Sequence, residues 1–94
     1  MAAYMIARIE VTNPEGYLKY ASQTVAIAEK FGGRFLVKAG QMEQLEGKGP
    51  DRHVVIEFPD ADAARSFYNS DDYRNILPIA LDNSTRDAVI VEGV

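Results

Sequence analysis

Two charged side chains that could do chemistry lie inside apolar, strand-like segments of this 94-residue chain. Arg34 begins the segment Arg34-Phe35-Leu36-Val37, and Glu57 lies in the segment Val54-Val55-Ile56-Glu57-Phe58. A guanidinium can bind a substrate carboxylate through two parallel hydrogen bonds. A carboxyl group among apolar neighbours can act as an acid or a base, because burial raises its pKa and an adjacent arginine lowers it. The sequence therefore indicates Arg34 as a candidate substrate-binding residue and Glu57 as a candidate catalytic residue.

Both residues also have a purely structural interpretation. Arg34 could form a salt bridge at a sheet edge with Glu46 or Glu57, and neither reading of Arg34 is favoured. Glu57 is more readily explained as the partner of Arg8 or Arg52 on a covered sheet face. We favour the Arg8–Glu57 pair, because the expected topology makes their strands neighbours. Arg8 is the second candidate substrate-binding residue.

Three tyrosines recur at helical spacing and could bring phenols to one site. Tyr17 and Tyr20 lie in one predicted helix and Tyr68 in the next. Aromatic residues with this spacing are mostly core residues, which is the favoured interpretation here. Phenols that face one sheet could also line a pocket, so Tyr20 and Tyr68 join Glu57 as candidate catalytic residues.

The sequence gives no sign of a metal or cofactor site. His53 is the only histidine, and an ordinary strand position is the favoured interpretation of it. One histidine, scattered carboxylates and no cysteine provide no metal-ligand spacing. Gly32-Gly33 follows a predicted helix, whereas phosphate-binding glycines precede one. We therefore expect no metal and no cofactor.

Composition limits the classes of protein that remain. A hydrophobic content of 47% is typical of a globular chain, and the length predicts a single domain over residues 1–94. A formal net charge of −4 argues against nucleic-acid binding, which needs a basic surface. No apolar run approaches the ~18 residues of a membrane span. We expect a soluble cytoplasmic protein with no membrane partner.

Hydrophobic periodicity and capping residues predict the elements that must position these side chains. The predicted strands are 4–11, 34–39, 52–58 and 87–92, with a shorter strand-like piece at 42–46 and a loop at 82–84. The predicted helices begin after Asn13, Asp60 and Ser70, and the last one runs through Leu77 or slightly beyond. This order is the ferredoxin-like βαββαβ pattern: an α+β fold with an antiparallel sheet and its helices on one face.

Strand alternation predicts a second sheet face that is too apolar to stay bare. Phe35 and Val37 are expected to face the helices, and Arg34, Leu36 and Lys38 the opposite side. The opposite side of the other strands combines aliphatic and charged residues. A monomer of this size rarely exposes such a patch. We therefore expect a homodimer in which two sheets pack face to face around a two-fold axis.

Sequence blocks along nearly the whole chain resemble a known family. The blocks are Pro14-Glu15, Gly32-Gly33-Arg34-Phe35-Leu36-Val37, Leu45-Glu46-Gly47, Val55-Ile56-Glu57-Phe58-Pro59, Ala63-Ala64-Arg65 and Val89-Ile90-Val91-Glu92-Gly93. They are similar to the domain-of-unknown-function family thirteen-thirty, within the dimeric α/β-barrel superfamily. The resemblance implies a ferredoxin-like monomer, a dimeric α/β barrel and no established activity. Relatives in that superfamily include cofactor-independent monooxygenases, muconolactone isomerases and haem-degrading enzymes.

Two functions of different kinds remain open from the sequence. The first is a cofactor-independent enzyme that performs acid–base chemistry on a small organic molecule with a carboxylate. In it Arg34 and Arg8 would bind the substrate, while Glu57, Tyr20 or Tyr68 would move protons. The second is a non-enzymatic ligand-binding or assembly domain whose mixed sheet face only builds the dimer.

Overall fold

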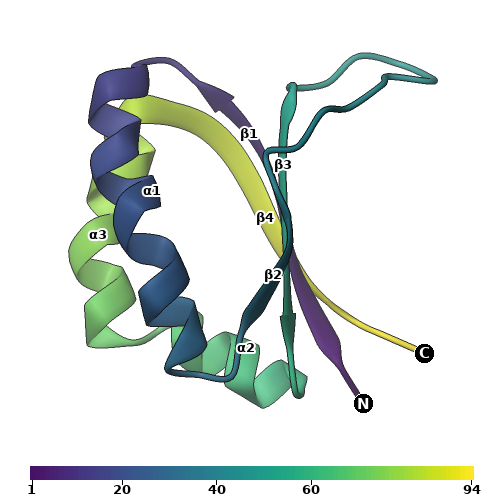
Figure 1. Ribbon diagram of the computed structural model, residues 1–94, viewed down its shortest axis with the longest axis vertical. Helices are drawn as coiled ribbons and strands as arrows, with labels where there is room; N and C mark the ends of the chain where they lie inside the picture. The colour runs from purple at the N-terminus through teal and green to yellow at the C-terminus, as the bar shows by residue number, and fades with distance from the viewer.

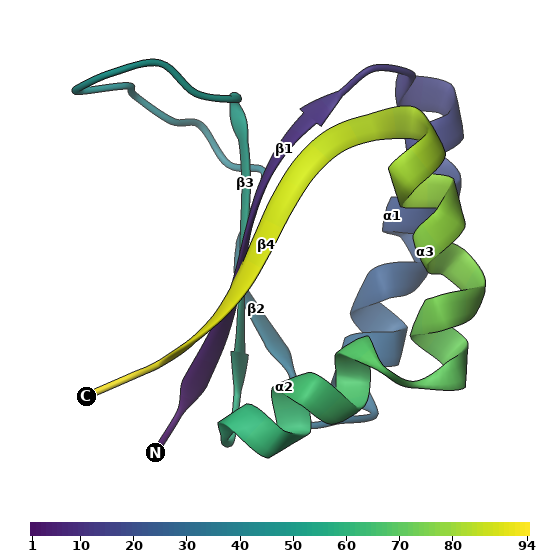
Figure 2. The same cartoon turned by 180° about the vertical axis from the view of Figure 1, so that it is seen from behind.

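A four-stranded antiparallel sheet carries three helices on one face in the computed structural model, which describes all 94 residues (Figures 1 and 2). Across the sheet the strand order is β2-β3-β1-β4. The chain runs through β1 (Ala3–Val11), α1 (Pro14–Glu29), β2 (Arg34–Lys38), β3 (Arg52–Phe58), α2 (Ala61–Tyr68), α3 (Asp71–Asn83) and β4 (Ser84–Glu92). The ferredoxin-like α+β prediction is confirmed. No helix is both long and apolar enough to cross a membrane.

Short polar side chains start each helix where the sequence predicts it. The side chain of Asn13 accepts a hydrogen bond from the Gly16 amide, and Asp60 accepts one from Ala63 at 2.8 Å. Ser70 caps α3 in the same way. These bonds satisfy amides that have no partner inside the helix. After α1 the chain reverses at Gly32, whose φ of 79° suits glycine.

The hydrophobic core lies between the helices and one face of the sheet. Met5, Ala7 and Ile9 of β1 point into it, as their alternation predicts. The rings of Phe67 and Tyr73 lie at its centre with centroids 4.6 Å apart, in a tilted arrangement that aromatic pairs favour. The helical layer is therefore anchored by aromatic packing, which also fixes where the phenol of Tyr73 can point.

The chain between β2 and β3 differs from the prediction of a short strand at 42–46. Those residues form no strand, and every residue from 40 to 49 is exposed. The segment reaches out on the side of the sheet opposite the helices, where both termini also lie (Figure 1). It has no neighbouring strand to pair with, so an extended sequence pattern there does not become part of the sheet.

Helix α3 is longer than predicted, and the loop expected at 82–84 is absent. The helix continues past Pro78 to Asn83, and β4 begins at Ser84. Proline removes one backbone donor, but buried Ile76, Leu77 and Ala80 hold both halves of the helix against the core. The carbonyl of Asn83 also accepts hydrogen bonds from two amides in the turn after β1, which fixes the end of the helix.

An irregularity in β2 changes which side chains face the helices. Phe35 pairs with Ile56, but the register then shifts so that Val37 pairs with Val55 and Lys38 with Val54. An extra residue of this kind reverses the alternation of the side chains beyond it. The predicted faces of Val37 and Lys38 are therefore wrong: Lys38 lies on the helix side of the sheet and Val37 on the other.

Candidate functional site

A small cavity between the helices and the sheet gathers basic and phenolic side chains from five elements. Its volume is about 30 Å³, which is room for the polar head of a ligand. The polar groups around it are Lys38, Arg52, Arg86, Tyr17, Tyr20, Tyr73 and Thr24, and apolar core residues form the rest of the wall. No aspartate or glutamate lines this cavity, which we call the basic cavity.

The local fold explains how three cations reach one place. Arg52 precedes Val54 and Ile56 on the helix side of β3, and Arg86 lies opposite Ile9 on the helix side of β4. Lys38 reaches the same side only because of the register shift in β2. The three side chains come from three strands and converge beneath α1.

Aromatic faces partner the two guanidinium groups. The Arg52 guanidinium carbon lies 5.1 Å from the centroid of the Tyr17 ring, and that of Arg86 lies 5.2 Å from the centroid of Tyr20. Cation–π contacts of this kind stabilise a charge without using its N–H donors. Arg52 Nε and Arg86 Nη1 are buried and have no hydrogen-bond partner. Buried donors are nearly always satisfied, so these two need an explanation.

Two buried phenols form a hydrogen-bonded pair at the inner end of the basic cavity. The Tyr20 and Tyr73 hydroxyl oxygens are 2.7 Å apart, and Arg86 Nη2 donates to the Tyr73 oxygen at 3.5 Å. Each phenol has one proton and can also accept. The pair uses one of its two protons internally, which leaves the other for a ligand.

Burial and charge set the ionisation of this cluster. Burial raises the pKa of the Tyr73 phenol, the nearby Tyr20 phenol adds to the effect, and Arg86 partly opposes it. Burial also raises the pKa of Tyr17. For Arg86, burial acts to lower the pKa, but the neighbouring Tyr20 and Tyr73 phenols, which become negative only at the high pH where a guanidinium titrates, outweigh burial and the pKa is raised. Arg86 therefore stays cationic, and Tyr73 stays a neutral donor over the physiological pH range.

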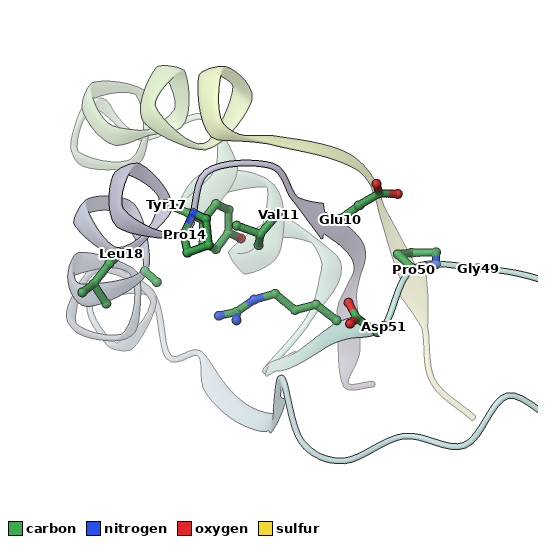
Figure 3. Close-up of a pocket in the computed structure, with 10 residues that line it drawn as sticks. Glu10, Val11, Pro14, Tyr17, Leu18, Gly49, Pro50 and Asp51 are labelled. Atoms are coloured by element: carbon green, nitrogen blue, oxygen red, sulfur yellow. The ribbon is translucent and has the colours of Figure 1, made fainter.

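An open groove of about 680 Å³ adjoins the basic cavity. Pro14, Tyr17 and Leu18 of α1 lie along one side of it, and the carboxylates of Glu10 and Asp51 lie across from them (Figure 3). The groove and the basic cavity share Tyr17, Ala21 and Arg52 as walls. A ligand could therefore place one end among the cations and its body in the groove.

Arg34, Arg8 and Glu57, which the sequence suggested as site residues, do not line the basic cavity. Arg34 Nη2 donates to Glu57 Oε1 at 3.0 Å, and the Tyr4 hydroxyl donates to the same carboxylate at 3.4 Å. Arg8 pairs with Asp87 at 3.4 Å. The favoured Arg8–Glu57 pair is wrong, because the strand register puts Arg8 opposite His53 and Asp87.

Of the tyrosines named from sequence as catalytic candidates, only Tyr20 lines the basic cavity. Tyr68 is half-buried, its ring packs tilted against that of Tyr73 with centroids 5.5 Å apart, and the Arg74 guanidinium lies over its face. Sequence reasoning missed Tyr73, Arg52, Arg86 and Lys38. Arg52 lies at alternate positions with Val54 and Ile56, and this pattern could have placed its side chain on the helix side of the sheet. Arg86 lay just before the predicted start of its strand, so no face was assigned to it.

Carboxylates and the single histidine do not gather into a metal-ligand group. No set of three or more His, Asp or Glu side chains lies close enough together to hold a metal ion. His53 lies on the sheet face opposite the helices, beside the segment 42–46, and its Nδ1 is buried without a partner.

Comparison with solved structures defines the fold class. A protein of unknown function from Rhodopseudomonas palustris matches with a TM-score of 0.79 and 16% identity over 99% of this chain and 82% of its own. A dimeric ferredoxin-like protein from Jannaschia sp. matches with a TM-score of 0.75 and 12% identity over 99% of this chain and 100% of its own. SnoaB, a cofactor-independent oxygenase from Streptomyces nogalater, matches with a TM-score of 0.68 and 15% identity over 99% of this chain and 93% of its own. These similarities show a ferredoxin-like fold.

The sequence profile of one family identifies the chain more closely. The family described as domain of unknown function (DUF1330) matches residues 2–94. The chain therefore belongs to this family, as its sequence blocks indicated. No curated protein matches the sequence significantly.

An alkaline titration should separate the five tyrosines of this chain. Because burial raises the pKa of Tyr17 and Tyr73 above the ordinary 10.0, we expect two phenols to ionise late in the absorbance of tyrosinate. Tyr73→Phe should remove one of them. A raised folded-state pKa also means that the stabilisation from protonated Tyr73 is complete below pH 10 and is lost as the pH rises further. A titration in which Tyr73→Phe removes no late-ionising phenol relative to wild type would contradict this assignment.

Proposed function

We propose that this protein is a homodimeric, cofactor-independent enzyme that performs acid–base chemistry on a small organic molecule in the basic cavity. The observation that carries the proposal is the Tyr20–Tyr73 hydroxyl pair at 2.7 Å beside the Arg86 guanidinium. Paired phenols with a free proton and an adjacent fixed cation suit the stabilisation of an oxyanion that forms during a reaction. The fold similarity to a cofactor-independent oxygenase supports an enzyme that needs no cofactor.

The reaction type follows from what the basic cavity contains. Its polar groups are hydrogen-bond donors and cations, with no carboxylate among them. When a carbonyl compound loses a proton from the adjacent carbon, negative charge collects on its oxygen. Tyr20 or Tyr73 would donate a hydrogen bond to that oxygen, and Arg86 would balance its charge. Glu10 or Asp51, the carboxylates of the adjoining groove, would accept that proton as the general base.

The homodimer would form on the sheet face opposite the helices. Val89 and Val91 expose 52% and 46% of their surface there, and half-buried Ile6 and Val55 lie between them and Val37. Aliphatic side chains on one flat face favour a partner of the same kind. Similar structures described as dimeric and ferredoxin-like support this arrangement. The segment 40–49 and both termini extend on this side (Figure 1), where they would contact the second subunit.

Solvent deuterium exchange tests the enzymatic proposal without knowledge of the natural substrate. Pyruvate, phenylpyruvate and levulinate would be incubated with the protein in D₂O, and loss of the proton signal next to the carbonyl followed by NMR. We expect wild type to accelerate exchange of at least one compound. Tyr20→Phe and Tyr73→Phe should each slow it by ~10²-fold, the usual contribution of a positioned acid or base.

The matched control for this assay is Tyr4→Phe, which changes a phenol on the opposite sheet face. It should exchange at the wild-type rate. If wild type accelerates none of the three compounds above buffer, the enzymatic proposal fails. Binding of the same compounds without exchange would then favour the alternative, a non-enzymatic ligand-binding domain.

A charge placed on the proposed interface should separate the dimer. Val89→Glu would bury a carboxylate between two sheets, and isolated buried charges are strongly unfavourable. We expect sedimentation to give a dimer for wild type and a monomer for this variant at micromolar concentration. Leu81→Glu is the matched control, because Leu81 is 58% exposed on α3, away from that face. A monomeric wild type, or a dimeric Val89→Glu, would contradict the proposal.

A further inference from the structure

We propose that the basic cavity binds the carboxylate of a small organic monocarboxylate whose apolar body lies in the adjoining groove. This inference deepens the proposed function, in that it names the class of ligand for the same cavity. It assigns the carboxylate to Arg52 and Arg86, with Lys38 at the edge, and not to Arg34. Four observations support it: the charge of the cavity, its unpaired donors, its shape and the sign of the charge at its mouth.

Positive charge collects in the basic cavity without compensation. The four ion pairs of the structure use Arg8, Lys30, Arg34 and Arg65. Lys38, Arg52 and Arg86 belong to none of them, although the whole chain carries a net charge of −4. A protein with surplus acids that leaves three neighbouring cations unpaired lacks the anion that would complete the cluster. Lys38 is exposed, whereas Arg52 and Arg86 are partly buried. Partial burial of two charges without a partner is unfavourable, so a ligand anion would stabilise them.

The unpaired donors indicate a flat, two-oxygen anion. Arg52 Nε and Arg86 Nη1 are buried without an acceptor, and both guanidinium groups rest on tyrosine rings. The contacts with Tyr17 and Tyr20 hold the two guanidinium groups in place and leave Arg52 Nε and Arg86 Nη1 without an acceptor, although Arg86 Nη2 donates to Tyr73. A carboxylate has the geometry to accept from such N–H groups, and hydrogen bonds between ionised groups are the stronger kind. The spare phenol proton of the Tyr20–Tyr73 pair is a further donor.

Size and charge at the mouth limit the rest of the ligand. A cavity of about 30 Å³ admits little more than the carboxylate itself. The body must then extend past Tyr17 and Arg52 into the groove, whose walls include Pro14 and Leu18. Glu10 and Asp51 lie across that groove (Figure 3). A second carboxylate at the far end of the ligand would meet like charges, so the site favours monocarboxylates over dicarboxylates.

Calorimetric titration with benzoate tests the site directly, with benzamide as a neutral molecule of the same shape and terephthalate as the dicarboxylate. We expect binding of benzoate, weaker binding of terephthalate and no binding of benzamide. Arg86→Gln and Arg52→Gln should each lower the affinity for benzoate by about tenfold or more, as expected for loss of a charge-assisted hydrogen bond. Equal binding of benzoate and benzamide would overturn the proposal.

Two controls separate this site from other arginines and from misfolding. Arg34→Gln removes the cation paired with Glu57, and Arg65→Gln removes one on the exposed surface of α2. Both should bind benzoate as wild type does. Arg86→Lys keeps the charge and should bind better than Arg86→Gln, provided that each variant melts cooperatively. Loss of binding in Arg34→Gln with retention in both Arg86→Gln and Arg52→Gln would move the carboxylate to the opposite face and refute the inference.

The benzoate titration and the deuterium-exchange assay test different claims. Benzoate has no exchangeable proton next to a carbonyl, so its titration reports the anion site alone. Binding of benzoate without exchange of any keto acid would support the monocarboxylate site and reject the enzymatic proposal. Exchange that depends on Tyr20 and Tyr73, with no benzoate binding, would support the enzyme and reject the monocarboxylate site.

Discussion

Unpaired positive charge between the helices and the sheet is the constraint on which the rest of this structure depends. Arg52 and Arg86 are held by aromatic faces, at 5.1 Å from Tyr17 and 5.2 Å from Tyr20, where a carboxylate would be the usual partner. This arrangement positions the guanidinium groups and keeps buried N–H donors free. The phenol pair and the raised pKa of Tyr73 follow from the same burial. The arrangement would therefore need little rearrangement to bind the anion that we propose as its ligand.

The two proposed tasks of the molecule, ligand binding and dimerisation, fall on opposite faces of the sheet. On the helix side, alternation along β3 and β4 brings Arg52 and Arg86 inward among core residues. On the other side, Arg34 pairs with Glu57 and Arg8 with Asp87, while several aliphatic residues remain exposed. Paired charges beside exposed valines form a surface that can pack against a copy of itself with little penalty. Ligand and partner would thus be bound by opposite faces of one thin layer.

Much of the fold could be predicted from the sequence because its signals are local. Caps such as Asn13 and Asp60 and the alternation of Met5, Ala7 and Ile9 act over a few residues. The site was harder, because it depends on how strands align. The shift in β2 that turns Lys38 inward arises from pairing with β3 and leaves no mark in composition. The Arg8–Glu57 prediction failed for the same reason. Their strands, β1 and β3, are neighbours as predicted, but the residue-by-residue register between them cannot be read from the sequence.

A crystal structure with bound 4-bromobenzoate tests the central claim most directly, because the bromine locates the ring by its anomalous signal. The account predicts the carboxylate against the N–H edges of Arg52 and Arg86 and the bromine in the groove beside α1. It also predicts that the Tyr20–Tyr73 pair turns its spare proton toward the ligand. A carboxylate bound instead at Arg34 or Arg8 on the opposite sheet face, or a ring seated in the groove with its carboxylate turned away from the cations, would contradict the account.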